Sequence, residues 1–242
     1  MISLGDQMSH QAEYNARVAI TLDNISDPRR LEEPESSVRI LSVNVVHAAL
    51  PFRPWFIGYG VFLGDGLIVT AAHVIGRAFF LTPPRVLVAG QELPAKVVVA
   101  RTAGGVDLAI LAVPQEKLPI SLRLRRAALC RGRAPAGARV LVAYPEKVAA
   151  SQTVAPRLVL HQDAGFDTFI DDVEASGTGV FDSRTKCLLG IVTERFPKAV
   201  PPRRRGPLAP DAVRYAGYFV PSDEIRKMMN EYRSRLSRLT RK

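Results

Sequence analysis

The sequence predicts an all-β fold of two six-stranded antiparallel β-barrels followed by a C-terminal α-helix. Three observations lead to this prediction. Short runs rich in β-branched and aromatic residues follow one another between turn residues, they fall into two series of about six, and helical periodicity is clear only at the C-terminus. With 242 residues, 47% of them apolar, the chain can bury the core of one large or two small domains.

The first series of strands lies between residues 38 and 113. A Gly64-Asp65-Gly66 turn between two of its runs is a hairpin signal, because glycine and aspartate adopt the tight turn conformation readily. The predicted strands are 38–46, 57–63, 67–70, 86–88, 95–100 and 108–113.

The second series lies between residues 139 and 220, after an arginine-rich crossover at 123–133. A proline- and arginine-rich insertion, 196–214, interrupts it and is interpreted as a mobile loop. The predicted strands are 139–143, 157–161, 168–170, 179–181, 188–192 and 215–220.

Three regions are predicted along the chain. Residues 1–37 are polar and are expected to be an extension with little structure of its own, and residues 38–222 form the globular domain, with barrels at about 38–122 and 134–222. Residues 223–242 form a basic helix, for which Ser222 is a good N-cap. Its apolar stripe, expected to pack against a barrel, is Ile225, Met228, Met229, Tyr232, Leu236 and Leu239.

The formal charge of +10 is uneven, with arginines clustered at 203–205 and along the C-terminal segment. A basic surface can bind nucleic acid, an acidic protein or anionic lipid, but a solvated face without a specific partner is commoner. Nucleic-acid binding ranks last, because the chain has no zinc-finger spacing and no aromatic RNA-binding motif. An acidic partner at the basic surface is kept as one possibility beside the solvated face.

Two cysteines, Cys130 and Cys187, make no disulfide framework and fit no metal-ligand spacing, so both are expected to be free and partly buried, and no metal or cofactor is predicted. No apolar run has the length of a membrane span, and the first eleven residues contain no continuous apolar segment typical of a signal peptide. The expected compartment is the cytoplasm, unless a leader has been removed.

Three residues in order point to nucleophilic catalysis: His73 after a hairpin, Asp107 before an apolar strand, and Ser176 in a turn of small residues. Each alone has a commoner explanation, as a core histidine, a turn carboxylate and an ordinary Ser-Gly turn. Together they supply the base and the carboxylate that a serine hydroxyl needs to become a nucleophile. An imidazole removes the proton at neutral pH, and a carboxylate orients the imidazole. The order His, Asp, Ser is that of chymotrypsin-type enzymes.

The motifs around these residues resemble those of trypsin-like serine proteases, and among them the bacterial HtrA (Deg) proteases. The histidine motif is TAAHV at 70–74, the aspartate motif is DLAIL at 107–111, and the nucleophile motif is SGTGVF at 176–181. Residues 136–145 are similar to a strand of the second barrel, and residues 218–222 to the junction with the last helix. The resemblance spans roughly residues 38–232, and five motifs in one order are far more specific than any single one.

The resemblance implies a serine endopeptidase that works through an acyl-enzyme, with an oxyanion hole from the backbone N–H groups of Glu174 and Ser176. The substrate pocket it implies is lined by Ile170, Ile191, Val192, Thr193 and Glu194. Its apolar floor favours a small or medium apolar side chain, while Glu194 could narrow the pocket or attract a basic group.

Several positions depart from the family pattern. Glu174 stands where glycine is usual, and Ala175 stands where the family has aspartate or asparagine. Without a carboxylate at Ala175, residues 1–37 are not expected to act as a trypsinogen-type activation peptide. No PDZ domain is expected, since only a helix follows Val220. The alternative to an active peptidase is a catalytically silent or gated protease-like module that binds acidic partners through its basic surface.

Overall fold

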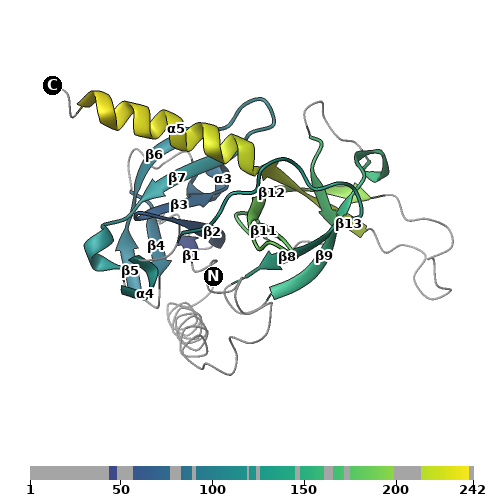
Figure 1. Ribbon diagram of the computed structural model, residues 1–242, viewed down its shortest axis with the longest axis horizontal. Helices are drawn as coiled ribbons and strands as arrows, with labels where there is room; N and C mark the ends of the chain where they lie inside the picture. Colours follow the sequence, from purple (N-terminus) through teal and green to yellow (C-terminus); the bar gives the residue numbers. More distant parts are fainter. Residues whose placement is uncertain are drawn as a thin grey trace, which may run out of the picture.

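Strands dominate the computed structural model, which describes residues 44–47, 57–76, 83–88, 91–118, 120–123, 126–144, 148–160, 166–171, 175–198 and 214–239. They form two bodies side by side, with one long helix, α5, across them (Figure 1). The predicted all-β fold with a C-terminal helix is therefore confirmed. The N-terminal extension and the Arg203–Arg205 segment lie outside the described residues.

The first body is a seven-stranded antiparallel sheet in the order β5-β4-β1-β2-β3-β7-β6. Its edge strands, β5 and β6, are separated in the chain only by Ala95, so the chain turns directly from one edge of the sheet into the other. The sheet has one strand more than the six that the sequence predicts, because β5 was not among them. The strands are β1 (Asn44–His47), β2 (Ile57–Gly64), β3 (Leu67–Thr70), β4 (Arg85–Val88), β5 (Gln91–Pro94), β6 (Lys96–Arg101) and β7 (Leu108–Ala112).

The second body is a closed six-stranded barrel in the order β10-β13-β12-β11-β8-β9. The strands are β8 (Arg139–Ala143), β9 (Val148–Val154), β10 (Phe169–Asp171), β11 (Gly179–Asp182), β12 (Leu188–Lys198) and β13 (Arg214–Pro221).

One predicted strand of this barrel, 157–161, is wrong. The strand is β9, whose sequence VAASQTV has no clear β signal. Its first five residues pair with β8 and its last two with β10. Pro156 instead begins the 3-10 turn η4 (Pro156–Leu158), since proline fixes a helical φ and suits the first turn. Cross-strand pairing has therefore overridden local propensity.

Short helical turns fill the connections. They are α3 (Ala72–Ile75) after β3, and η3 (Gln115–Lys117) and α4 (Ile120–Arg123) in the crossover between the two bodies.

Alternate residues of the central strands enter different cores, as the period of a strand dictates. In β3, Ile68 packs into a cluster built only from the first body, whereas Val69 packs into a cluster shared with the second. In β11, Val180 joins a cluster of the second barrel, whereas Phe181 joins the shared one. The shared cluster joins the two bodies through an apolar interface, which fixes the elements that meet there.

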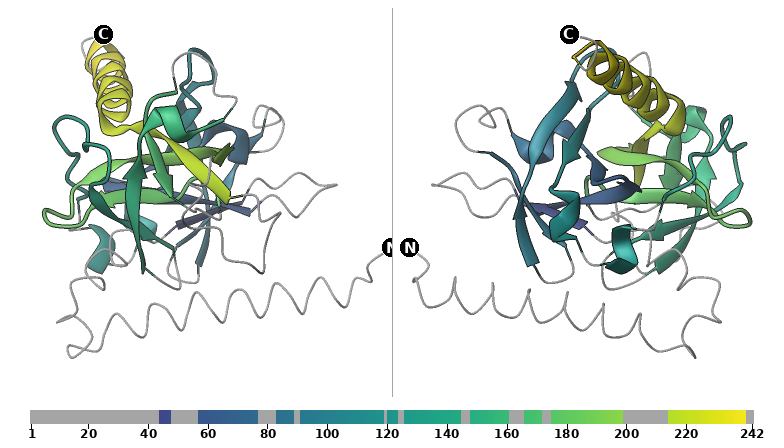
Figure 2. Two further views of the ribbon diagram at one scale, coloured as in Figure 1. Left: turned by 90° about the vertical axis from the view of Figure 1, so that its right-hand side faces the viewer. Right: turned by 60° about the vertical axis from the view of Figure 1, so that its left-hand side comes forward.

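Helix α5 (Ser222–Leu239) packs on this interface through its first half (Figures 1 and 2). Ile225 and Met228 are fully buried, Met229 and Tyr232 are half-buried, and Leu239 is 72% exposed. The predicted apolar stripe therefore packs as expected only in the first half of the helix. Within the described residues, no helix is long and apolar enough to span a membrane.

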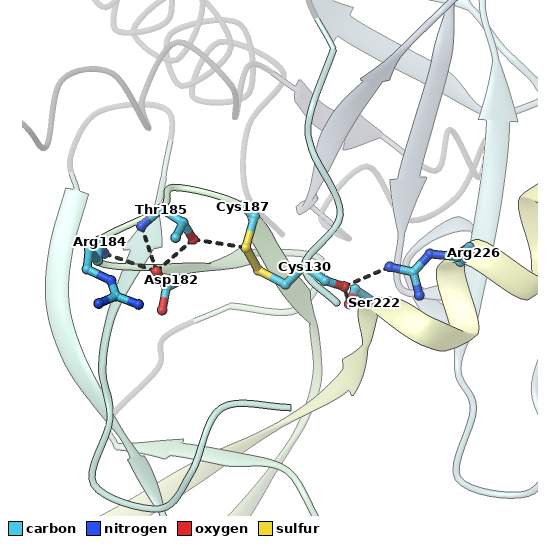
Figure 3. The surroundings of a disulfide bond; sticks show 7 residues. All are labelled: Cys130, Asp182, Arg184, Thr185, Cys187, Ser222 and Arg226. Carbon is cyan, nitrogen blue, oxygen red and sulfur yellow. Dashed lines mark hydrogen bonds between the residues drawn. A yellow bond between two sulfur atoms is a disulfide. The ribbon is translucent and has the colours of Figure 1, made fainter. Parts of the chain in front are cut away.

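Cys130 and Cys187 form a disulfide, so the prediction of two free cysteines is wrong. The bond ties the crossover to the start of β12, and a backbone hydrogen bond from Cys130 N–H to the Leu188 carbonyl, 2.9 Å, lies beside it. The Cys130 carbonyl accepts hydrogen bonds from Ser222 Oγ at 2.9 Å and from the Arg226 guanidinium at 2.7 Å (Figure 3). The Ser222 hydroxyl, predicted as a helix cap, thus anchors α5 to the crossover.

Candidate active site

His73 lies in the short helix α3, directly after β3, at the edge of the first body. Its neighbours Ala71, Ala72 and Val74 are buried, while the His73 side chain is 45% exposed. The Ala72 N–H donates to the Asp107 carbonyl at 3.3 Å, which links the histidine segment to the start of β7. The sequence prediction placed both residues correctly at strand ends.

Asp107 holds His73 at two points. One carboxylate oxygen, Oδ1, accepts the backbone N–H of His73 at 3.1 Å, and the other, Oδ2, pairs with ring Nδ1. An ionised carboxylate can only accept hydrogen bonds, so Nδ1 is the donor. In the neutral ring, Nε2 is then the nitrogen with a free lone pair, as a general base requires.

This pair raises the pKa of His73 above its usual 6.5. The main cause is the hydrogen bond to Asp107; the negative charges of Asp107 and Glu194 add to it, and partial burial opposes it. The groups around His73 therefore stabilise its protonated form. This suits a histidine that must hold a proton during a reaction.

Ser176 stands in the turn before β11, where Gly177 has a φ of +84°. A Cβ on Gly177 would lie closer than 3.0 Å to the Tyr59 carbonyl, so only glycine fits between β2 and this turn. The Tyr59 N–H donates to the Ser176 carbonyl at 2.9 Å, and the Gly177 N–H donates to the Val192 carbonyl at 2.7 Å. The serine is thereby fixed where the two bodies meet.

The Ser176 hydroxyl donates to the Thr193 carbonyl at 3.2 Å; among the described residues, no hydrogen bond joins it to His73. Thr193 is the extra residue of a β-bulge in β12, between Val192 paired with Phe219 and Glu194 paired with Tyr218. A bulge interrupts the ladder and re-aims side chains. Here it brings Thr193 and Glu194, which are consecutive, to one cavity.

This cavity, of about 450 Å³, is lined by four of the predicted site residues, and Ser176 is not part of its lining. Its lining includes the paired His73 and Asp107 from the first body and Thr193 and Glu194 from the second, so residues far apart in sequence meet there. The lining is completed by Thr102, Gly105, Val106 and Phe166.

The other predicted pocket residues have a different place. Ile170 and Val192 pack together in a core cluster of the second barrel, and Ile191 packs in the shared cluster, each at most 1% exposed. Residues 172–174 lie outside the described residues, so the oxyanion hole at Glu174 and Ser176 stays a prediction.

Two contacts that the sequence did not predict hold the loop leading to Asp107. Tyr218 in β13 donates its hydroxyl to the Gly105 carbonyl at 2.8 Å, and burial raises the pKa of Tyr218 to about 12, so the donor proton is retained. At the other end of the loop, Arg101 pairs with Glu231 of α5 at 2.8 Å. No local sequence signal marks these contacts, because their partners are 113 and 130 residues apart.

No protein-family model matches the chain, and no curated protein matches its sequence. Solved structures do match its fold. The Rv3671c protease from M. tuberculosis in its active form matches with a TM-score of 0.55 and 21% identity over 84% of this chain and 86% of that one. Kallikrein-related peptidase 10 in complex with Zn²⁺ matches with a TM-score of 0.57 and 15% identity over 80% of this chain and 95% of that one. The serine endoprotease from Yersinia pestis matches with a TM-score of 0.52 and 19% identity over 81% of this chain and 65% of that one.

The chain has the trypsin-like serine protease fold. The predicted resemblance is therefore confirmed at the level of the fold. In this fold, His73 and Asp107 come from one body and Ser176 from the other, and Thr193, which accepts the Ser176 hydroxyl, lines the cavity with His73 and Asp107.

Proposed function

We propose that the chain is a serine endopeptidase that uses His73, Asp107 and Ser176 as its catalytic triad. The observation that carries the proposal is the double contact of Asp107 with His73, through the backbone N–H at 3.1 Å and through ring Nδ1. A carboxylate needed only for structure has no reason to fix the tautomer of a half-exposed imidazole beside a cavity. The position of Ser176, whose hydroxyl contacts the wall of the same cavity through Thr193, supports the assignment.

The reaction follows from these groups. Rotation about χ1 turns the Ser176 hydroxyl from the Thr193 carbonyl toward His73, whose Nε2 takes the hydroxyl proton as Oγ bonds to the substrate carbonyl carbon. The C–N bond then breaks, the proton passes from Nε2 to the leaving amine, and an acyl-enzyme remains. Water, deprotonated by the same nitrogen, hydrolyses the ester. Asp107 stays ionised and stabilises the imidazolium at each step.

A second candidate is a silent or gated module, which the hydrogen bond from Ser176 to Thr193 favours, because a hydroxyl held there is not yet activated. In this state the protein would bind acidic partners through its basic surface, in a chain whose formal net charge is +10. The same candidate includes an oxyanion hole that forms only after the backbone at Glu174 rearranges. Because glycine adopts unusual backbone conformations more readily, Glu174→Gly should then raise kcat/KM several-fold.

Hydrolysis of a mixed peptide library, with products read by mass spectrometry, tests the proposal. Wild type should cleave internal bonds, and Ser176→Ala should lower kcat by about a million-fold. Residual turnover of Ser176→Ala within about tenfold of wild type would contradict the triad. Absence of turnover in both, with a folded protein, would favour the silent module.

The proposed compartment depends on the cysteines. The cytoplasm was expected, but structural disulfides persist where thiols are oxidised, so the Cys130–Cys187 bond favours the alternative of a chain exported by a leader. Thiol labelling of the protein in intact cells and in each cell fraction distinguishes the two: blocked cysteines in an exported fraction support export, and free cysteines in the cytoplasm support the original expectation.

A further inference from the structure

The cavity beside His73 contains a carboxylate that no cation neutralises within the described part of the chain. Glu194 is exposed and forms no ion pair with any described residue. Asp107, which lines the same cavity, pairs with His73, and in the second body Asp167 pairs with Arg133 and Asp171 with Lys198. In a chain with an excess of cationic side chains, an unpaired carboxylate at this position requires an explanation.

The β-bulge explains why Glu194 faces the cavity. Regular alternation along β12 would send Thr193 and Glu194 to opposite sides of the sheet, but Thr193 is the unpaired extra residue, and both line the cavity. The charge of Glu194 reaches the His73 ring, where it helps to raise the pKa. The next residue, Arg195, does not neutralise it, because its guanidinium stacks over the Tyr215 ring at 4.8 Å.

The other walls suit a cation with an apolar stem. The half-buried Phe166 supplies an aromatic ring, whose face attracts ammonium and guanidinium groups, and Val106 supplies apolar surface. The volume of about 450 Å³ lies within the range of ligand pockets and admits a long side chain.

We propose that Glu194 makes this cavity a binding site for a cationic side chain, arginine or lysine, of the peptide substrate. The proposal rests on the proposed peptidase function and adds the substrate class. The overall charge of +10 does not oppose it, because exposed charges farther than about 8 Å are largely screened at physiological ionic strength, whereas Glu194 acts by contact.

The experiment compares matched peptides that contain one arginine, or its neutral isostere citrulline, at each position around the scissile bond. In wild type, kcat/KM should favour arginine by about fivefold at one position, as expected for a contact between partly exposed charges. Glu194→Gln should bring that ratio close to one, and raising the salt concentration should reduce it in wild type.

The ratio of kcat/KM between arginine and citrulline peptides separates an effect on binding of the cation from an effect on the catalytic step. A change in the His73 pKa caused by Glu194→Gln acts equally on arginine and citrulline peptides, so it cancels in the ratio. The matched control is Glu116→Gln, which removes the same charge from an exposed 3-10 turn and should keep the wild-type ratio. No arginine preference in wild type, or a preference unchanged in Glu194→Gln, would overturn the proposal.

Binding to Ser176→Ala distinguishes failure of this proposal from failure of the proposed function. Fluorescence anisotropy of the same labelled peptides should show tighter binding of arginine than of citrulline, lost in the Ser176→Ala, Glu194→Gln double variant. If wild type does not hydrolyse peptides but this preference is present, the cation site stands without the peptidase. If hydrolysis occurs and no preference appears in either assay, the cation site is wrong and the peptidase stands.

Discussion

Asp107 contacts His73 twice, through the backbone N–H and through ring Nδ1. The backbone contact fixes the distance between the start of β7 and helix α3, and the ring contact fixes the tautomer. One carboxylate thus couples the fold of the first body to the basicity of Nε2.

Asp107→Asn should lower kcat for peptide hydrolysis by about four decades while the protein stays folded, because asparagine allows the wrong tautomer. The matched control is Asp171→Asn, since Asp171 pairs with Lys198 instead and should affect kcat little. Steady-state kinetics with circular dichroism of each variant measures both. A larger loss for Asp171→Asn would mean that the orienting carboxylate is misassigned.

The pH dependence should reflect the raised pKa of His73. Because the neutral ring is the base, kcat/KM should rise with pH through a midpoint above 6.5. The same shift stabilises the fold fully below pH 6.5, and this contribution disappears as pH rises through the folded pKa. Asp107→Asn should therefore destabilise the protein more at pH 6 than at pH 9, because the hydrogen bond and charge of Asp107 stabilise the protonated ring. NMR titration of the His73 ring measures the shift directly, and a midpoint at or below 6.5 in wild type would contradict it.

Gly177→Ala should destabilise the protein strongly and abolish activity, because the new Cβ meets the Tyr59 carbonyl and the φ is +84°. Gly137→Ala is the matched control: its φ is +81°, but nothing lies within 4 Å of a Cβ there, so it should cost only about 1–2 kcal/mol. Chemical denaturation compares them. Equal costs would show that the turn at Ser176 can move away from β2 freely.

Removing the disulfide should lower the free energy of unfolding by about 2–4 kcal/mol, because it closes a loop with a sequence separation of 57 residues. Guanidinium denaturation measures this free energy for the wild type and for the Cys130→Ala, Cys187→Ala double variant, each with and without reductant. Wild type should lose stability in reductant, whereas the double variant should not respond. A wild type insensitive to reductant would indicate that the bond does not form.

The sequence predicted what depends on local pattern. Strands β3 and β8 have the predicted bounds, and His73 and Asp107 have the predicted places because each follows or precedes an apolar run. It missed what depends on distant partners. Strand β9 has no local signal, and the link between Cys130 and Cys187 is undetectable from two isolated cysteines.

The bulge at Thr193 was also missed, because it arises where β12 and β13 lose register rather than from any residue type. This register shift decides the site. It turns Glu194 into the cavity, whereas the apolar residues before it, Ile191 and Val192, pack in the core. A pocket assigned from sequence order alone therefore mixes lining residues with buried ones.

The most direct test of the triad is labelling by a serine-directed phosphonate, followed by peptide mapping. A serine hydroxyl reacts only when a base accepts its proton, so a stoichiometric adduct should form on Ser176, and His73→Ala and Asp107→Asn should each suppress it. Folded wild-type protein that forms no adduct, or an adduct at Ser176 that persists in His73→Ala, would contradict the account.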